Sequence, residues 1–371
     1  MLIAEQTKTI DACRFCFMCR HVCTLGVVSG KESDTPRGKG LILFKILKGH
    51  AQYTPDLVET VYRCCLCGLC EAWCQASCTP PAAILAARAD IVALGQEPAA
   101  VRQIKENLLQ TGNPFGLPAA ERFRSIQAPQ GRTPAEVLYY VGCDTAYLQP
   151  QIANAFAKLL EAAGVKFTLL AGEHSTGKPL YALGYRDEAR AMAQRLAEQI
   201  RATGCRTLVT TCPSALDAFK TDYPALGADL GGIEVLHAAQ YLDRLVQQKR
   251  LTPKKPVATQ ASVLDGTYLG RTHKLFEEPR RVLQQVPQLG LREMVWTRQF
   301  AYAAGEPAGL LRLLHPELSR QLAARVLGEA VQSGVQTLVT TCPVTRTTLA
   351  GVEPQGPKVQ DLVELLAESV G

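Results

Sequence analysis

Cysteine is the residue type with the clearest potential for chemistry in this chain of 371 residues. The chain contains 14 cysteines, and ten of them lie between Cys13 and Cys78. Many are three residues apart, which is too local to staple a fold with disulfides but suits thiolate ligands of a metal centre. We therefore expect metal ligation in a reducing compartment rather than a secreted disulfide framework.

Two cysteine runs share the spacing C-x2-C-x2-C-x3-C. The first run consists of Cys13, Cys16, Cys19 and Cys23, and the second consists of Cys64, Cys67, Cys70 and Cys74. In two-cluster ferredoxins, three cysteines of such a run bind one cluster and the fourth binds the other. The pattern therefore predicts two [4Fe–4S] clusters, one held by Cys13, Cys16, Cys19 and Cys74, the other by Cys64, Cys67, Cys70 and Cys23. Two zinc sites are the alternative, but zinc usually takes separated Cys-x2-Cys pairs.

Four further residues near the runs bear on these centres. Cys65 and Cys78 are left over, and free cysteines commonly pack as small buried hydrophobes. Cys78 is the residue that would replace Cys74 as a ligand if the loop were shifted. Arg37 and Lys39 are the cations that we expect to tune the clusters or to meet a partner.

The elements that must position these cysteines change along the chain. Residues 1–95 hold short helical patterns over 41–47 and 57–62, and glycine and proline interrupt residues 96–135. From residue 136, short β-branched runs alternate with helical patterns, and this alternation predicts parallel-sheet α/β units. The expected strands are 137–141, 165–170 and 207–211, and the expected helices are 152–163 and 185–203.

A seven-residue sequence occurs twice in the second part of the chain. Thr207 to Pro213 recurs letter for letter as Thr337 to Pro343, each time after a helical pattern that ends at glycine. The repetition predicts two homologous α/β domains, residues 136–250 and 251–371. The predicted fold is α+β and multidomain: an all-α ferredoxin-like head over residues 1–95, a connector over 96–135, and the two α/β parallel-sheet domains.

Composition excludes several classes of protein. The charge of +6, with 20% charged and 47% hydrophobic residues, is ordinary for a globular chain and argues against nucleic acid as the main partner. No apolar run approaches the ~18 residues of a membrane helix, and the first residues lack the pattern of a signal peptide. We expect a cytoplasmic protein whose membrane association is at most peripheral and made through partners.

The double cysteine run, the Pro36-Arg37-Gly38 turn and the two α/β repeats together resemble fused heterodisulfide-reductase CB-type iron–sulfur proteins. The resemblance is strongest to the iron–sulfur subunits of glycolate and lactate oxidase complexes. In that family each repeat carries a cysteine-rich CCG motif. This chain keeps only Cys143 and Cys212 at matching positions of the first repeat, and only Cys342 in the second. The resemblance therefore implies degenerate CCG domains without the additional cluster of the family.

The resemblance implies an iron–sulfur electron-transfer subunit of an oxidoreductase complex, with no catalytic residue of its own. It would relay single electrons through two [4Fe–4S] clusters. The donor would be a flavoprotein such as an FAD-linked 2-hydroxyacid dehydrogenase, and the acceptor a quinone, a ferredoxin or another subunit. Two alternatives stay open: a heterodisulfide-reductase-like catalytic subunit with an additional metal site in the C-terminal half, and an assembly or sensor protein.

A zinc site in the C-terminal half is a further hypothesis. Cys143, His174 and Cys212 are expected on loops at the same end of neighbouring strands, with Asp265 or water as the fourth ligand. Cys212 and Cys342 each precede a proline at an expected helix start, where the helix dipole would lower the thiol pKa. The simpler alternative is that these residues are remnants packed as small side chains.

Overall fold

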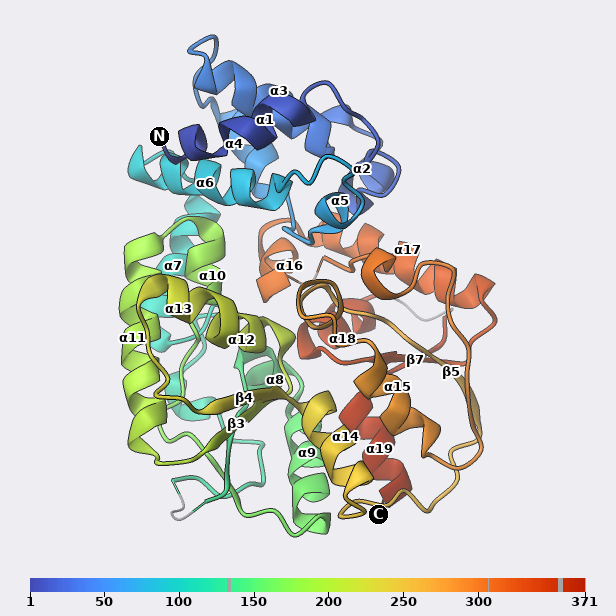
Figure 1. Cartoon of the computed structure of the whole chain (residues 1–371). Helices are drawn as coiled ribbons and strands as arrows, with labels where there is room; N and C mark the ends of the chain where they lie inside the picture. Colours follow the sequence, from blue (N-terminus) through green and yellow to red (C-terminus); the bar gives the residue numbers. More distant parts are fainter. Residues whose placement is uncertain (132–134, 306, 353–355, 371) are drawn as a thin grey trace.

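The computed structural model describes residues 1–131, 135–305, 307–352 and 356–370. A helical head sits above two parallel sheets with their helices (Figure 1). The two sheets have four strands each and equivalent strand orders, β2-β1-β3-β4 and β6-β5-β7-β8. The expectation of two α/β units with parallel sheets is therefore confirmed.

The head is formed by short helices that begin at strong start signals. Proline occupies the first turn of three of them, where its missing N–H costs nothing, and the Thr35 hydroxyl caps one by accepting a hydrogen bond from Gly38 N at 3.1 Å. The helices expected over 41–47 and 57–62 lie within α3 and α4. The head helices are α1 (Thr7–Cys13), α2 (Thr24–Ser29), α3 (Pro36–Leu47), α4 (Pro55–Tyr62), α5 (Leu69–Ala72) and α6 (Pro80–Ala93).

The segment over 96–135 is more regular than its glycines and prolines suggest. Helix α7 (Ala99–Thr111) fills its first half, because the helix breakers within the segment cluster at and after Gly112. Gly112 itself ends the helix in the left-handed conformation, with φ +71°. The helix packs against α10 (Lys178–Leu183) and so ties the head to the first repeat.

Each sheet is built around one central strand pair. All residues of β1 are buried, as expected for a parallel strand covered on both faces. The copied sequences fall at equivalent places, on β3 and β7, and each follows a long helix, α11 (Arg186–Ala202) or α17 (Pro316–Gln332). The strands are β1 (Val137–Tyr140), β2 (Phe167–Leu169), β3 (Thr207–Thr210), β4 (Glu234–His237), β5 (Thr259–Val263), β6 (Leu289–Leu291), β7 (Thr337–Thr340) and β8 (Lys358–Asp361).

The remaining helices cover the sheets and join the two repeats. Helix α19 packs against α9, and α14 packs against α15, so that helices of both repeats share one apolar core. These helices are α8 (Cys143–Leu148), α9 (Pro150–Ala162), α12 (Pro213–Asp217), α13 (Tyr223–Leu226), α14 (Ala238–Gln247), α15 (Glu277–Gln284), α16 (Leu310–Leu314), α18 (Pro343–Ala350) and α19 (Leu362–Val370), with π-helical turns at Ala218–Asp222 and Thr267–Thr272.

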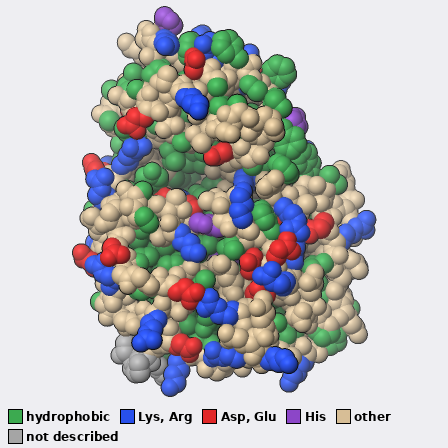
Figure 2. Space-filling view, viewed as in Figure 1, with side chains coloured by type: hydrophobic (Ala, Val, Ile, Leu, Met, Phe, Trp, Pro, Cys, Tyr) green, Lys and Arg blue, Asp and Glu red, His purple; other side chains and the backbone are tan. Residues whose placement is uncertain are grey.

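The head is packed onto both repeats. On the first repeat, the Tyr62 hydroxyl donates to Leu183 O at 2.9 Å, and Gly184 has no room for a Cβ, which would lie 2.5 Å from Arg88 O. On the second repeat, the Trp73 ring contacts those of Trp296 and Phe300. A hollow remains in the surface where the head meets the body (Figure 2). None of the helices in the described ranges has the length and apolarity needed to cross a bilayer.

Candidate metal centres

The first cysteine run surrounds one small cavity of the head. Cys13 ends helix α1, Cys16 and Cys19 follow on the next turns, and Cys74 follows α5. All four line the same cavity, and the extra cysteine Cys78 lines it as well. Cys78 N donates to Cys74 Sγ at 3.3 Å, so the two residues lie side by side at this cavity.

The second run surrounds an adjoining cavity that lies deeper in the head. Its cysteines come from the loop between α4 and α5, from α5 itself, from the start of α2 and from the end of α1. Apolar side chains such as Leu25, Leu43 and Ile84 form the rest of the wall. Cys13 and Cys70 line both cavities, so the two are neighbours. The cysteines of this cavity are Cys23, Cys64, Cys65, Cys67 and Cys70 together with Cys13.

Glycines let the backbone wrap closely around these cavities. A Cβ on Gly38 would lie 2.1 Å from Glu32 O, so the Pro36-Arg37-Gly38 turn requires glycine where it crosses the preceding loop. Gly68, with φ +69°, turns the second run into α5. These contacts explain the turn in physical terms: it holds the loop beside Cys23, whose Sγ lies 3.7 Å from Asp34 O.

The thiols of both runs are crowded, and all except the exposed Cys16 are half-buried. Burial, assisted by the neighbouring thiols, raises the pKa of Cys13 and of Cys23 to about 12 and that of Cys19 to about 11. Such thiols become thiolates readily only when a positively charged centre binds them. Two adjoining cavities lined by sulfur donors and apolar walls therefore fit two iron–sulfur clusters. Which cysteines ligate each cluster stays a prediction.

The two runs differ in their access to solvent. Cys16 is exposed, and the neighbouring side chains of Phe15 and Phe17 are 71% and 68% exposed. Cys65 is buried, and Leu69, at the start of α5, has no exposed surface. The first run therefore includes an exposed, apolar part of the molecular surface, whereas the four cysteines of the second run are half-buried.

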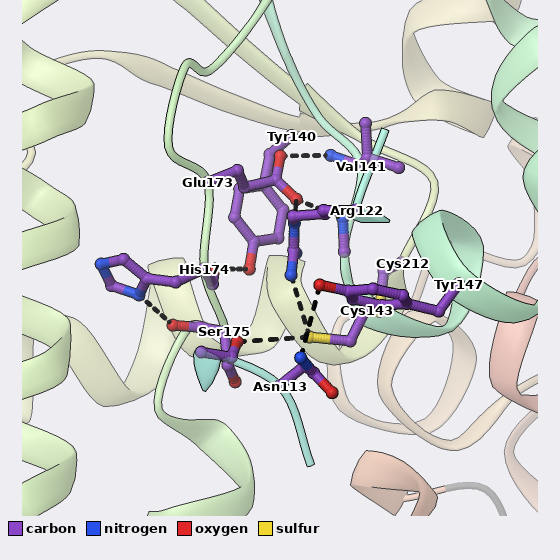
Figure 3. A network of polar contacts seen from close by, with 12 residues as sticks. Asn113, Arg122, Tyr140, Val141, Cys143, Tyr147, Glu173, His174, Ser175 and Cys212 are labelled. Atoms are coloured by element: carbon purple, nitrogen blue, oxygen red, sulfur yellow. Dashed lines mark hydrogen bonds and ion pairs between the residues drawn. The ribbon is translucent and has the colours of Figure 1, made fainter. Parts of the chain in front are cut away.

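The degenerate motif of the first repeat is filled by an ion pair (Figure 3). Arg122 donates to Glu173 Oε1 through Nε at 3.1 Å and through Nη2 at 2.6 Å, and its Nη1 lies 3.6 Å from Cys143 Sγ. Glu173 also accepts hydrogen bonds from the backbone N–H groups of Val141 and Gly142, at 2.8 and 3.0 Å. The guanidinium and carboxylate thus occupy the space at the carboxyl end of β1 and β2, and the two remaining thiols, Cys143 and Cys212, are too few for a cubane.

The residues of the zinc hypothesis do not converge. His174 Nδ1 lies 2.9 Å from Ser175 O, and the imidazole points away from Cys143 Sγ (Figure 3). Asp265, the suggested fourth ligand, is held by both Nη atoms of Arg280, each at 2.8 Å. Within the described ranges, no three His, Cys, Asp or Glu side chains are arranged to hold a single metal ion.

The expected effect of the helix dipole on Cys212 is wrong. Cys212 does precede α12, and backbone N–H groups of Ala215 and Ser214 lower its pKa, but desolvation in its surroundings outweighs them and raises it to about 12. Helix α12 has only five residues, which limits its dipole. Cys212 is therefore a half-buried thiol that stays protonated at neutral pH rather than an activated one.

The second repeat has an analogous ion pair at its sheet edge. Asp265 follows β5, and Arg280 from α15 binds both this carboxylate and Glu293, which follows β6. The Arg280 side chain is 5% exposed and that of Asp265 is 1% exposed. Both repeats therefore place a buried arginine–carboxylate pair where parallel strands end.

Three buried arginines, Arg88, Arg122 and Arg271, escape sequence reasoning. For Arg88 a signal is present, because it is the one basic residue in the apolar stretch Pro80–Ala89 of α6. Of the two cations named from the sequence, Lys39 is buried beside Cys23 and donates to Asp34 O at 2.6 Å, whereas Arg37 pairs with the half-exposed Glu32.

Comparisons with known proteins agree with this architecture. The model of the "Cysteine-rich domain" family CCG matches residues 137–216, from β1 to α12. A solved structure of a hypothetical protein from Helicobacter pylori shares the fold, with a TM-score of 0.60 and 10% identity over 90% of this chain and 68% of that chain.

Two curated relatives have informative names. A dihydromethanophenazine:CoB--CoM heterodisulfide reductase subunit from Methanosarcina barkeri is 27% identical over 100% of this chain and 96% of its own length. The probable iron–sulfur-binding oxidoreductase FadF of Bacillus subtilis is 28% identical over 86% of this chain and 48% of its own length. Together, the CCG match and these relatives support the family of iron–sulfur oxidoreductase subunits with cysteine-rich CCG domains.

Proposed function

We propose that this chain is the electron-transfer subunit of an oxidoreductase complex and holds two [4Fe–4S] clusters. The proposed ligands are Cys13, Cys16, Cys19 and Cys74 for one cluster, and Cys64, Cys67, Cys70 and Cys23 for the other. Such clusters supply one-electron carriers whose potentials depend on their surroundings. The observation that carries the proposal is the adjacency of two cysteine-lined cavities with Cys13 and Cys70 in their common wall.

The proposed electron donor is a flavoprotein, such as an FAD-linked 2-hydroxyacid dehydrogenase, and the acceptor is a quinone, a ferredoxin or another subunit. A relative from Syntrophomonas wolfei, 25% identical over 83% of this chain and 46% of its own length, is named EtfAB:quinone oxidoreductase, which supports partners of this kind. The exposed side chains of Phe15 and Phe17 beside Cys16 offer an apolar contact surface at the first run. A reducing, cytoplasmic setting suits the crowded free thiols.

A catalytic role for the C-terminal half has less support. In the first repeat, the Arg122–Glu173 pair occupies the place of the family motif, and desolvation raises the pKa of the two half-buried thiols nearby. In the second repeat, alanines stand at 303 and 304, where the Cys-Cys pair of the motif is expected. We infer that this half is a scaffold that holds the head and meets partners.

Metal analysis of anaerobically purified protein tests the proposal. About eight irons per chain, with interacting S = 1/2 signals in the EPR spectrum after dithionite reduction, is the expected result. Zinc in place of iron, reproduced after reconstitution with iron and sulfide, would overturn it. Markedly more than eight irons would instead revive the heterodisulfide-reductase-like alternative.

A further inference from the structure

Two buried arginines lie directly beneath the second cysteine run. Arg88, on α6, is 2% exposed and donates to Cys64 O at 2.5 Å, to Tyr62 O at 3.0 Å and to Ala182 O at 2.7 Å. Arg271 is 6% exposed, lies in the π-helical turn of the second repeat and donates to Cys67 O at 2.7 Å. Each guanidinium thus binds the backbone carbonyl of a predicted cluster ligand.

Neither of these arginines has a carboxylate partner among the described residues. Within those ranges Arg88 donates to backbone carbonyl oxygens, and Arg271 adds the Thr267 hydroxyl and the carbonyls of Gln299 and Ala301. The other deeply buried arginines, Arg122 and Arg280, do have carboxylate partners. A buried charge is costly unless an opposite charge lies near it. The missing negative charge is therefore expected from another source.

The other charged side chains near the second run do not supply the missing negative charge. One buried carboxylate, Asp34, lies beside Cys23, but Arg63 binds it at 2.9 Å and Lys39 lies 3.8 Å from it. The surroundings of the second run therefore keep an excess of buried positive charge. An oxidised cubane with four thiolates carries a net double negative charge, which matches the two guanidinium groups that lack a carboxylate.

The surroundings of the first run are different. Arg14 pairs with Asp11, which is 54% exposed, and Arg20 is 64% exposed and pairs with Glu32. Glu32 is shared with Arg37, so this group keeps one positive charge, but charges in contact with water are screened by solvent and salt. The first run therefore receives little net positive potential from its neighbours.

We propose that Arg88 and Arg271 give the inner centre, at the second run, a higher reduction potential than the outer centre, at the first run. Reduction adds one negative charge to a cluster, and buried cations favour it in a low-dielectric interior. Burial alone opposes reduction, and the outer centre includes the exposed Cys16, so the inference requires that the two buried cations outweigh the difference in burial.

This inference rests on the proposed function and adds to it a direction of electron flow. Electrons delivered at the exposed edge around Cys16 run toward the inner centre, because that centre holds them more strongly. The inner centre borders the hollow between head and body, whose walls include Cys67, Arg271, Lys178 and Tyr268 (Figure 2). Electron exit is therefore expected at this hollow, away from the point of entry.

A potentiometric titration followed by EPR tests the order of the two potentials in the unmodified protein. After exchange into D2O, pulsed EPR distinguishes the centres, because the outer one lies closer to solvent and couples more strongly to deuterium. The first electron added is expected on the centre with the weaker deuterium coupling. Its appearance on the strongly coupled centre would overturn the inference.

Variants assign the effect to the two arginines. Arg271→Met and Arg88→Met are each expected to lower the reduction equilibrium constant of the inner centre about tenfold, which is about 59 mV for one electron. Arg271→Lys and Arg88→Lys, which keep the charge, should restore most of it. Arg14→Gln, beside the first run, is the matched control and should leave the inner potential unchanged.

The outcome separates this inference from the proposed function. Iron content well below eight in the unmodified protein would contradict the proposed function itself. Full iron content in the methionine variants with both potentials unchanged would contradict only the role of the arginines. If a methionine variant does not take up iron, the deuterium measurement on the unmodified protein still decides the order of potentials.

Discussion

The head and the α/β half differ in the partners of their buried arginines. In the α/β half, Arg122 and Arg280 each bind a buried carboxylate, so their charges are compensated by the polypeptide itself. In the head and at its border, Arg88 and Arg271 bind backbone carbonyls near crowded thiols. The first region compensates its buried arginines with its own carboxylates, whereas Arg88 and Arg271 have no carboxylate partner among the described residues. In the first repeat an ion pair occupies the place of the family's cysteine motif, and the parallel sheet around it is complete.

Replacing one cysteine in each region is the strongest way to break this comparison. Cys70→Ser in the head should remove one cluster and lower the iron content from about eight to about four per chain. Cys212→Ser in the α/β half should leave the iron content unchanged, because no cluster is expected there. Iron and sulfide analysis after anaerobic purification measures both. Loss of iron in Cys212→Ser would show that the α/β half holds a metal.

Breaking the ion pair of the first repeat should have the next largest effect. Glu173→Gln leaves Arg122 buried without a counter-charge and should lower the free energy of unfolding by about 3–5 kcal/mol. The double variant Arg122→Met/Glu173→Gln removes the charge as well and should recover much of this loss. Urea unfolding followed by circular dichroism measures the three proteins. An equal decrease in the free energy of unfolding in the single and double variants would mean that lost packing, not the uncompensated charge, causes the destabilisation.

Buried histidines make the α/β half sensitive to acid. His237 accepts from Ala239 N through Nδ1, and its Nε2 lies 3.2 Å from Thr211 O, so both nitrogens of the neutral ring are used. Burial lowers its pKa from its ordinary value to about 4, and the pKa of His174 likewise. Because the unfolded chain then binds more protons, stability is fully present above about pH 6.5 and is lost as the pH falls toward about 4.

An asparagine at position 237 isolates this effect. His237→Asn keeps a good helix-capping residue but removes one titrating group, so its melting temperature should depend less on pH than that of the unmodified protein. The contribution of one such histidine is about 3 kcal/mol at most across this window. Thermal melting between pH 7 and pH 5, under anaerobic conditions, measures how steeply the melting temperature of each of the two proteins depends on pH. Identical slopes would exclude His237 as a source of the acid sensitivity.

The smallest effect is expected at the exposed edge of the head. Arg14→Gln removes an ion pair with Asp11 that faces water, and such pairs contribute about 0–1 kcal/mol. The same urea unfolding experiment measures it. A larger decrease in the free energy of unfolding than that caused by Glu173→Gln would mean that the exposed ion pair stabilises the protein more than the buried one.

Much of this fold can be predicted from local patterns. Short β-branched runs and the copied residues 207–213 and 337–343 are enough to place parallel strands, because their signals are local. The cysteine runs likewise indicate their chemistry by spacing. Helix α7 is the exception, because the breakers clustered from Gly112 onward make the whole segment look irregular, although they do not affect the residues before them.

The charge environment cannot be predicted in the same way. Arg271 and Cys67 are 204 positions apart, and Arg122 and Glu173 are 51 positions apart. Only the folded chain brings such residues together. The thiol of Cys212 shows the same limit, since a helix start is visible in the sequence but the burial that dominates its pKa is not.

The contacts of Arg88 and Arg271 also bear on the order in which the parts of the protein fold during synthesis. The head leaves the ribosome before the α/β half. However, the hydrogen bond of Arg88 to Ala182 O joins residues 94 positions apart, and that of Arg271 to Cys67 O joins residues 204 positions apart. Domains usually fold as they emerge, N-terminal ones first. Here the inner site reaches its final surroundings only after most of the chain has been synthesised. Cluster insertion at this site is therefore expected to be a late step of maturation, and a truncated chain would leave the ribosome with an unfinished head.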